Sequence, residues 1–316
     1  MRIVITGATS MIGVALIKIC IQNNCEILAI VRKNSKNEYR IPKSHLLHIV
    51  YADLDELDTV PVLDNKWDVF YHLAWKYTNR QDRDNPIYQE DNIRTTLSAV
   101  ELANRLGCRM FVGAGSQAEY GIVRDVINSE THTNPVTAYG MAKLSAGMMS
   151  RHLCEQYGII HVWTRIFSVY GINDTENSMI NYALRTWSKG EKAMFSAGTQ
   201  MWNFLYEDDA GKMLYLIGEM DVEGGVYCIA NDESQQLKLY IHKLADVYGS
   251  EAVYELSKNT KNSQVELNVD ISKTIAAIDY KPAIQFEDGI RKIIEAKKYG
   301  KASGENEKDK CFDTML

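Results

Sequence analysis

The chain has 316 residues, of which 46% are hydrophobic and 24% charged, and its formal net charge is −6 at pH 7. This composition is typical of a soluble globular protein with one large and one smaller core, and it excludes a concentrated basic surface for nucleic acid. No apolar run reaches the length of a membrane span, and Met1 leads directly into a predicted strand without a signal-peptide pattern. We therefore expect a cytoplasmic protein without nucleic-acid or membrane partners.

Six cysteines are scattered along the chain, and only Cys20 and Cys25 lie close together in sequence. Their spacing matches neither a zinc site nor a disulfide framework. The sequence therefore predicts reduced thiols and no metal site.

The first element is a predicted strand over residues 2–5, which is short, apolar and rich in β-branched side chains. The run Thr6-Gly-Ala-Thr-Ser-Met-Ile-Gly13 follows, and a helical stretch continues over residues 14–20. Strand, small-residue turn and helix are the parts of a pyrophosphate-binding turn, because backbone N–H groups and the positive helix end face the anion. We interpret this segment as a dinucleotide-binding turn, with the candidate cofactor-binding residues Gly7, Thr9, Ser10, Met11, Ile12 and Gly13.

Strands and helices alternate through the first half of the chain. Further strands are predicted at residues 26–31, 47–50, 67–74, 110–114 and 161–166, and the two clearest helices at residues 92–105 and 138–156. This alternation predicts a Rossmann-type α/β fold, a doubly wound parallel sheet whose ligands bind outside the carboxyl ends of the strands.

We expect the dinucleotide-binding domain over residues 1–170 and a small α/β substrate-binding cap over residues 171–297. Segments at about residues 203–230 return to the first domain, including a strand at residues 225–230. Residues 298–316 are polar and charged, which predicts a mobile tail.

Tyr139 and Lys143 stand four residues apart in a predicted helix, which places a phenol and an ammonium group on one face, about one turn apart. A nearby cation stabilises phenolate and lowers the pKa of the tyrosine, so the pair can act as general acid and base for a carbonyl–alcohol redox pair. A tyrosine and a lysine at this spacing are common by chance, so the prediction of a catalytic role depends on the other motifs around them.

With these motifs in order, the chain resembles the extended short-chain dehydrogenases/reductases, the NAD(P)-dependent sugar-nucleotide epimerase/dehydratase superfamily. The resemblance runs from Thr6 to about Ile294. Its landmarks are Thr6-Gly…Gly13, Ala52-Asp53-Leu54, His72-Leu73-Ala74, Asn92, Gly115-Ser116…Tyr120-Gly121, Tyr139…Lys143, Arg165…Tyr170-Gly171, Asn203-Phe204…Asp208-Asp209 and Tyr280-Lys-Pro282…Glu287-Asp-Gly289.

The resemblance implies that Asp53 and Leu54 hold the adenine and that Leu73 and Ala74 line the middle of the cofactor. Enzymes that bind NAD usually carry Asp or Glu at the end of the second strand, whereas this chain carries Arg32 and Lys33 there. Both side chains can pair with the 2′-phosphate that distinguishes NADP from NAD. The alternative interpretation is that they form a solvated basic turn without a ligand. We expect NADP(H) as the favoured cofactor and NAD(H) as the second choice.

In this family a serine hydroxyl donates to the substrate carbonyl, the tyrosine transfers the proton, and the lysine binds the nicotinamide ribose. Carried over, Ser116, Tyr139 and Lys143 form the catalytic set, and the last two also contact the cofactor. The remaining substrate contacts that the resemblance implies are Gln117, Arg165, Ser168 and Trp202.

Several positions depart from the family pattern. Ser10 replaces the middle glycine of the turn, which is compatible if its backbone is not left-handed. Trp202 stands where the family carries the arginine that binds the substrate diphosphate. Another basic residue could replace that arginine, but each candidate could equally be a solvated charge on a helix; the candidates are Arg185, Lys189 and Lys192. Asp208 and Asp209 are interpreted as helix-capping and structural.

Two further positions narrow the reaction. Dehydratases of the family carry Thr-Asp-Glu where this chain has Ser116-Gln117-Ala118, and the elimination needs an acid and a base besides the tyrosine. Gln117 and Ala118 cannot supply them, and we expect the carboxylate of Glu119 to point elsewhere. The basic end of the second strand argues against the epimerases, which generally retain NAD. The favoured function is therefore an NADPH-dependent reductase of the 4-keto group of a nucleotide-linked 4-keto-6-deoxy sugar.

Three alternatives remain open. An NAD(P)-dependent sugar-nucleotide 4-epimerase shares the fold and the catalytic set. Redox chemistry on a substrate without a nucleotide is the second alternative, and a non-catalytic cofactor-binding scaffold is the third, against which the intact catalytic set argues. The resemblance also implies a homodimer formed through the helices at residues 92–105 and 138–156.

Overall fold

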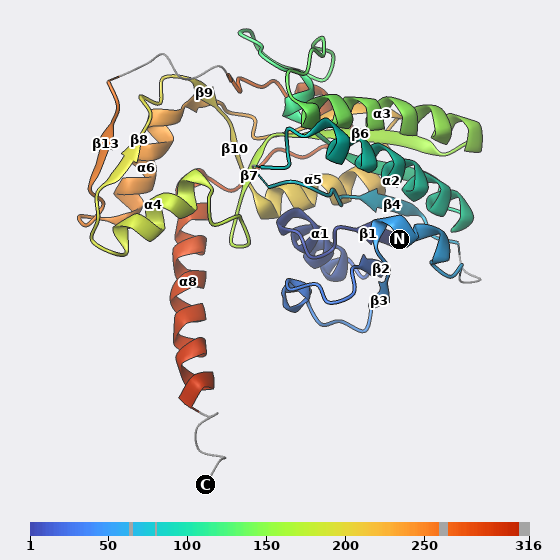
Figure 1. Ribbon diagram of the computed structural model, residues 1–316, viewed down its shortest axis with the longest axis horizontal. Coiled ribbons are helices and arrows are strands. Elements are labelled where there is room, and N and C mark those ends of the chain that lie inside the picture. The colour runs from blue at the N-terminus through green and yellow to red at the C-terminus, as the bar shows by residue number, and fades with distance from the viewer. Residues whose placement is uncertain (63–65, 80, 259–264, 310–316) are drawn as a thin grey trace.

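A seven-stranded parallel sheet forms the larger part of the molecule (Figure 1). The structure is a computed structural model that describes residues 1–62, 66–79, 81–258 and 265–309, with side chains described through residue 298. The strand order is β11-β6-β5-β4-β1-β2-β3. Its strands are β1 (Arg2–Thr6), β2 (Glu26–Val31), β3 (Leu47–Tyr51), β4 (Val69–His72), β5 (Met110–Ser116), β6 (Ile160–Ile166) and β11 (Gly225–Ile229).

This order confirms the predicted doubly wound sheet. Every neighbouring pair of strands runs parallel. The direction in which the chain adds strands reverses between β1 and β4, and in such sheets ligands bind beyond the carboxyl ends of the strands at that reversal.

Helices cover both faces of the sheet. On one face α1 (Met11–Gln22) packs against α5 (Glu207–Glu219), and on the other α2 (Pro86–Arg105) packs against α3 (Ala138–Tyr157). Within β1, Ile3 and Ile5 join the core under α1 and α5, whereas Val4 joins the core under α2. Successive side chains of a strand point to opposite faces, so a sheet covered on both sides requires the continuous apolar runs seen in the sequence.

A smaller body with an aromatic core lies beside the sheet, in agreement with the expected α/β cap. Its strands pair in twos, namely β10 (Phe204–Tyr206) with β7 (Ser168–Tyr170), β12 (Gln235–Gln236) with β9 (Met201–Trp202), and β13 (Tyr254–Leu256) with β8 (Ala193–Phe195). The remaining elements are α4 (Met179–Trp187), α6 (Leu237–Tyr248), α7 (Ser272–Ile278), α8 (Phe286–Asp309) and the short helices η1 (Glu38–Arg40), η2 (Leu54–Thr59) and η3 (Gln117–Glu119). A division of the chain into domains at residue 170 stays a prediction.

Two predicted boundaries are wrong, and the predicted mobility of the tail stays a prediction. Helix α2 begins at Pro86 rather than at Asn92, because the Asn85 side chain accepts a hydrogen bond from Ile87 N at 3.0 Å and proline suits the first helical position. Strand β4 covers only residues 69–72 of the predicted 67–74. The tail predicted from residue 298 continues α8 through Asp309, and residues 310–316 lie outside the described residues.

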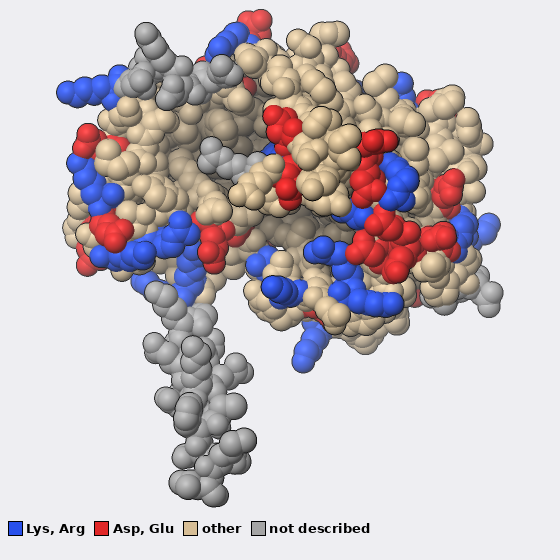
Figure 2. Space-filling model, viewed as in Figure 1, with Lys and Arg blue, Asp and Glu red and all other residues tan. Residues whose placement is uncertain are grey.

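The surface carries charges of both signs. On the face shown in Figure 2, acidic and basic side chains are interspersed rather than gathered by sign. None of the helices in the described ranges combines the length and apolar character that crossing a membrane requires.

Two histidines inside the sheet are held neutral. His72 on β4 and His161 on β6 flank Phe111 on β5 in a stacked row, with ring centroids 6.0 Å from Phe111 on each side. Burial lowers the pKa of His72 to about 3 and that of His161 to about 4. Neither ring therefore binds a second proton in the folded state until the pH is far below 6.5.

We expect the free energy of unfolding to fall as the pH drops from 6.5 towards 4. The unfolded chain binds protons on these histidines that the folded chain does not, which costs about 1.4 kcal/mol per pH unit and histidine. Urea denaturation at pH 7 and pH 5 measures the slope. It should be smaller in His161→Asn and unchanged in His45→Asn, which alters an exposed histidine; an equal slope in His161→Asn would contradict the assignment.

Candidate active site

The turn between β1 and α1 brings the backbone unusually close to neighbouring chain segments. Gly7 has φ +77°, and a Cβ there would lie 2.7 Å from the backbone nitrogen of Ala74. A Cβ at Gly13 would lie 2.2 Å from the carbonyl oxygen of Gly7. No side chain fits at either position, so the turn presents bare backbone at the end of β1.

Ser10 suits this turn despite replacing a glycine. Its φ of −76° and ψ of 162° are extended, not left-handed, which meets the condition set by the sequence. Its hydroxyl accepts a hydrogen bond from Gly13 N at 3.0 Å and caps α1. Thr9, Met11 and Ile12 are partly exposed around the same turn.

Arg32 and Lys33 follow the end of β2, and both are exposed. Neither side chain takes part in the ion pairs found among the described residues. Two uncompensated positive charges thus stand at the carboxyl edge of the sheet, where the sequence places the cofactor's adenosine.

Asp53 caps the short helix that follows β3. One carboxylate oxygen accepts a hydrogen bond from Leu54 N at 2.7 Å, and Lys76 Nζ lies 3.9 Å from the same oxygen. Lys76 also binds Asp55 and, at 3.0 Å, Asp91 on α2. These charges tie the segments after β3 and β4 to α2, while the side chain of Asp53 keeps 45% of its surface exposed.

The segment after β4 is held against the glycine turn. His72 bonds Thr6 at 2.9 Å and Thr96 at 3.3 Å through its two ring nitrogens. The side chain of Asn92 accepts from the backbone nitrogen of Lys76 at 2.7 Å and donates to its carbonyl at 3.2 Å. These contacts fix Leu73 and Ala74 beside Gly7, where the sequence expects the middle of the cofactor.

Tyr139 and Lys143 lie in the first turns of α3, which Thr137 caps by accepting from Gly140 N at 3.1 Å. Lys143 is buried, and its Nζ donates to the carbonyl oxygen of Ala114 at 2.5 Å. The same Nζ lies 3.6 Å from the ring centroid of Trp75 and 5.9 Å from that of Tyr139. Burial lowers the pKa of Lys143 to about 7.

The expectation that Lys143 lowers the pKa of Tyr139 towards neutrality is wrong for this arrangement. Burial raises the pKa of Tyr139, and this outweighs the opposing effects of the Arg83 charge and of a hydrogen bond with Ser116. The structure therefore brings together the hydroxyls of Ser116 and Tyr139, as expected, but places an arginine that the sequence analysis did not consider beside them.

Ser116 ends β5, and its position depends on Glu119. The buried carboxylate of Glu119 accepts hydrogen bonds from Ser116 N at 2.7 Å, from Trp163 Nε1 at 3.0 Å and from Arg165 Nε at 2.8 Å. These three contacts hold the Glu119 carboxylate against β5 and β6, and its absence from the chemistry stays a prediction.

Arg165 does not fit its expected role as a substrate contact. It is 6% exposed, pairs with Glu119, and its guanidinium lies 4.5 Å from the ring centroid of Tyr120. This side chain is structural, because leaving Glu119 buried without its cation would be strongly destabilising.

The other predicted substrate residues are dispersed. Gln117 follows Ser116 directly and is partly exposed. Ser168 lies on β7 opposite Phe204, and Trp202 lies on β9 opposite Gln235, where it packs against both the sheet core and the cap core. The contacts found among the described residues join neither Ser168 nor Trp202 to the pair of hydroxyls.

Asp209 has the structural role that the sequence suggested. Its carboxylate accepts hydrogen bonds from Tyr280 Oη at 2.5 Å, from Ala283 N at 3.2 Å and from Ile284 N at 2.9 Å. It therefore holds the segment before α8 against the start of α5.

A cavity of about 730 Å³ opens beside Tyr139 and was not foreseen from the sequence. The residues that line it are Thr78, Arg83, Asp84, Thr137 and Asn177. Most belong to the connection between β4 and α2, which has no periodicity and no motif that would have marked it. Trp75 was missed for the same reason, although it covers Lys143 and donates its indole N–H to Gln89 at 2.9 Å.

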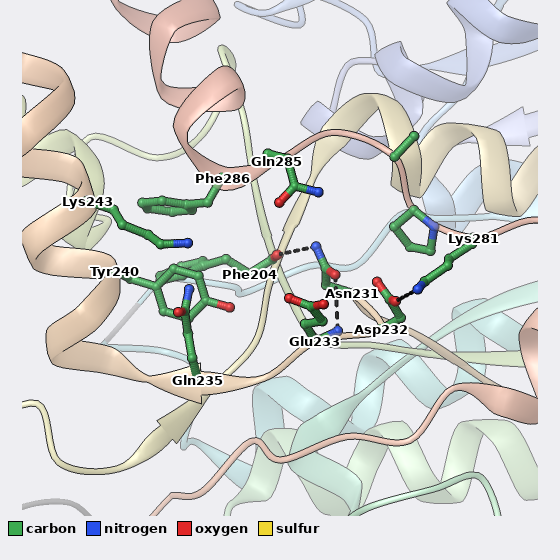
Figure 3. A pocket seen from close by; sticks show the side chains of 12 residues that line it. Phe204, Asn231, Asp232, Glu233, Gln235, Tyr240, Lys243, Lys281, Gln285 and Phe286 are labelled. Carbon is green, nitrogen blue, oxygen red and sulfur yellow. Dashed lines mark hydrogen bonds and ion pairs between the residues drawn. The ribbon is translucent and has the colours of Figure 1, made fainter.

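A second cavity, of about 230 Å³, lies in the cap among residues from β10, α6 and the start of α8 (Figure 3). Its charges are largely paired: Lys281 binds Asp232 at 2.6 Å, and Lys243 binds Glu287 at 3.2 Å. Neither cavity is lined by a residue that the sequence assigned to a site. The larger one is the candidate active site because its Arg83 lies against the Tyr139 ring and its Thr137 caps the helix that carries Tyr139 and Lys143.

Curated proteins of similar sequence match nearly the whole chain. Among curated proteins, UDP-glucuronic acid decarboxylase 1 of Arabidopsis thaliana is 24% identical over 307 residues, which cover 93% of this chain and 69% of that protein. The uncharacterized UDP-glucose epimerase YtcB of Bacillus subtilis is 23% identical over 310 residues, 93% of this chain and 97% of that protein.

Solved structures share the fold. UDP-glucuronic acid 4-epimerase from Bacillus cereus in complex with NAD superposes with a TM-score of 0.79 at 20% identity, covering 94% of this chain and 96% of that one. UDP-N-acetylglucosamine 4-epimerase from Methanobrevibacter ruminantium superposes with a TM-score of 0.81 at 22% identity, and the match covers 93% of this chain and 98% of that one. The description of the NAD dependent epimerase/dehydratase family matches residues 3–230. This match spans most of the chain, which therefore belongs to the NAD dependent epimerase/dehydratase family.

Proposed function

We propose that this protein is a nicotinamide-dependent sugar-nucleotide 4-epimerase that acts on a UDP-linked hexose or hexuronate. The observation that carries the proposal is that the side chains of Ser116 and Tyr139 interact beside the cavity lined by Arg83 and Thr137, without an acid or base at positions 117 and 118. Epimerases among the relatives and the solved structures support it. The net 4-ketoreductase favoured by the sequence has no such support and takes second place.

The residues at the carboxyl ends of β1 and β2 fit a bound nicotinamide dinucleotide. Gly7 and Gly13 leave bare backbone where a Cβ would collide, and the N-terminus of α1 follows at once. When bound, the dinucleotide supplies a reversible acceptor for the hydride at C4 of the sugar. The backbone of this turn would fit the pyrophosphate of either dinucleotide, NAD(H) or NADP(H).

Tyr139 and Ser116 account for the proton in this reaction. The phenolate of Tyr139 accepts the proton of the sugar C4 hydroxyl as C4 loses its hydride, which leaves a 4-keto sugar, while Ser116 donates a hydrogen bond to the same oxygen. With a dinucleotide bound, Tyr139 would return the proton to the C4 oxygen as the hydride returns to the opposite face of C4, so that no external reductant would be consumed.

We expect the protein to interconvert C4 epimers of UDP-glucuronate or UDP-glucose, followed through the sugar proton signals by NMR. Tyr139→Phe should slow turnover by about 10²–10⁴-fold, the range for a lost general acid–base group. Tyr157→Phe, at the far end of α3, serves as control and should retain the rate. Full turnover in Tyr139→Phe would exclude the proposed mechanism.

Other products would identify other reactions. Release of carbon dioxide from UDP-glucuronate would show a decarboxylase, and stoichiometric consumption of NADPH with a 4-keto-6-deoxy sugar nucleotide would restore the reductase. Binding of the dinucleotide without turnover of any of these compounds would indicate the scaffold.

The preference for NADP(H) remains a prediction, because the solved relatives named above include one in complex with NAD. Arg32 and Lys33 are exposed and available to a 2′-phosphate. If they bind it, Arg32→Ala with Lys33→Ala should weaken NADPH binding by about tenfold or more and leave NADH binding unchanged, since each charge-assisted pair contributes about 1.5–3 kcal/mol. Protein fluorescence measures both affinities, and an equal loss for the two dinucleotides would contradict the assignment.

We also propose that two copies associate through α2 and α3. Both helices expose large apolar side chains, namely Ile87, Met141, Met148 and Met149. Burying them in a dimer removes apolar surface from water. Light scattering at micromolar concentration should give twice the chain mass, and Met148→Glu with Met149→Glu should reduce it. A monodisperse monomer of the parent protein would rule the dimer out.

A further inference from the structure

A guanidinium group lies against Tyr139. The Cζ atom of Arg83 is 4.0 Å from the centroid of the Tyr139 ring, whereas the Nζ atom of Lys143 is 5.9 Å from it. The edge of Trp75 packs against the same ring, with centroids 6.0 Å apart. Of these two cations, the one nearer to the centre of the Tyr139 ring comes from the connection between β4 and α2.

Lys143 is committed to other contacts. Its Nζ donates to Ala114 O at 2.5 Å and lies 3.6 Å from the ring centroid of Trp75, which Gln89 holds through the indole N–H. Because burial lowers the pKa of Lys143 to about 7, this side chain is only partly charged at neutral pH. Arginine stays charged at every working pH.

The turn that carries Arg83 is anchored at both ends. Arg83 N donates to Asn79 O at 3.0 Å, and the Asn79 side chain accepts from Asp82 N at 3.0 Å. On the other side, the Asp84 carboxylate accepts a hydrogen bond from Ala138 N at 2.8 Å, directly before Tyr139. This hydrogen bond attaches the turn to the first residue of α3. It thereby fixes the position of the Arg83 guanidinium relative to the Tyr139 ring.

We propose that Arg83 is the electrostatic partner of Tyr139, supplying the positive charge that stabilises the phenolate when the tyrosine removes a proton, and that Asp84 is the positioning residue that holds it there. The charged and polar groups facing the phenol are Arg83, Lys143, Ser116 and Glu119. Of these, the carboxylate of Glu119 disfavours phenolate and is itself paired with Arg165. The proposal rests on the proposed function only in giving Tyr139 the role of acid and base.

The ionisation of residue 139 can be measured without substrate or cofactor. Tyrosine 139 is replaced by 3,5-difluorotyrosine, whose phenol is more acidic, and its ¹⁹F signal is followed against pH. In Arg83→Gln the label should ionise about one pH unit or more higher than in the parent protein, as expected for loss of an opposite charge at this distance. Arg83→Lys should lie between the two, and Asp84→Ala should shift in the same direction as Arg83→Gln.

Arg151→Gln is the matched control, because Arg151 is an exposed arginine of α3 that pairs with Glu155. The label should titrate there as in the parent. An unchanged titration in Arg83→Gln would overturn the proposal, and so would a larger upward shift in Lys143→Met than in Arg83→Gln. Arg83 is exposed, so its replacement leaves the core intact, and circular dichroism confirms the fold of each variant.

Turnover gives a second, separate result. In the proposed epimerase reaction, the limb of the kcat profile that reports Tyr139 should move to higher pH in Arg83→Gln by the same amount as the ¹⁹F titration. If no sugar nucleotide is turned over, the proposed function fails while the titration still decides the role of Arg83.

Discussion

The buried carboxylate of Glu119 holds together the end of the sheet on which the candidate site is built. Three hydrogen bonds, donated by Ser116 N, Trp163 and Arg165, take the place of the water that the carboxylate loses on burial. A buried charge is tolerated only with such partners, and removing one typically costs about 3–5 kcal/mol. The placement of Ser116 at the carboxyl end of β5 depends on this ion pair. The same pair engages the carboxylate that lies next to positions 117 and 118.

Burial then sets the charges of the site. Lys143 and Tyr139 both lose hydration in the first turns of α3, which lowers the pKa of the lysine and raises that of the tyrosine. Both shifts favour the neutral forms. The charge of Arg83 opposes the shift of the tyrosine without outweighing it, and Arg83 also lines the neighbouring cavity.

Much of the frame could be predicted from local sequence. The first two strands contain apolar runs at residues 3–5 and 27–31, and Tyr139 and Lys143 share a helix face by spacing alone. Gly7 and Gly13 mark the turn after β1, where the structure leaves no room for a side chain. The predicted start of α2 at Asn92 is wrong because Asn85 and Pro86 begin the helix before its apolar pattern does. The role of Arg165 was misassigned because pairing with Glu119 depends on two strands meeting, which no local pattern encodes.

The sequence by itself determined the parallel sheet and the alternation of strands and helices along the chain, because periodicity acts over a few residues. The assignment of Ser116, Tyr139 and Lys143 as a catalytic set follows from the family resemblance and stays a prediction. Only the tertiary structure decided which charges reach the phenol. Arg83 lies in an irregular connection, and its position over Tyr139 depends on Asp84 binding the start of α3, far along the chain. Desolvation and ion pairing depend on which segments pack together, and those distances exist only in the folded protein.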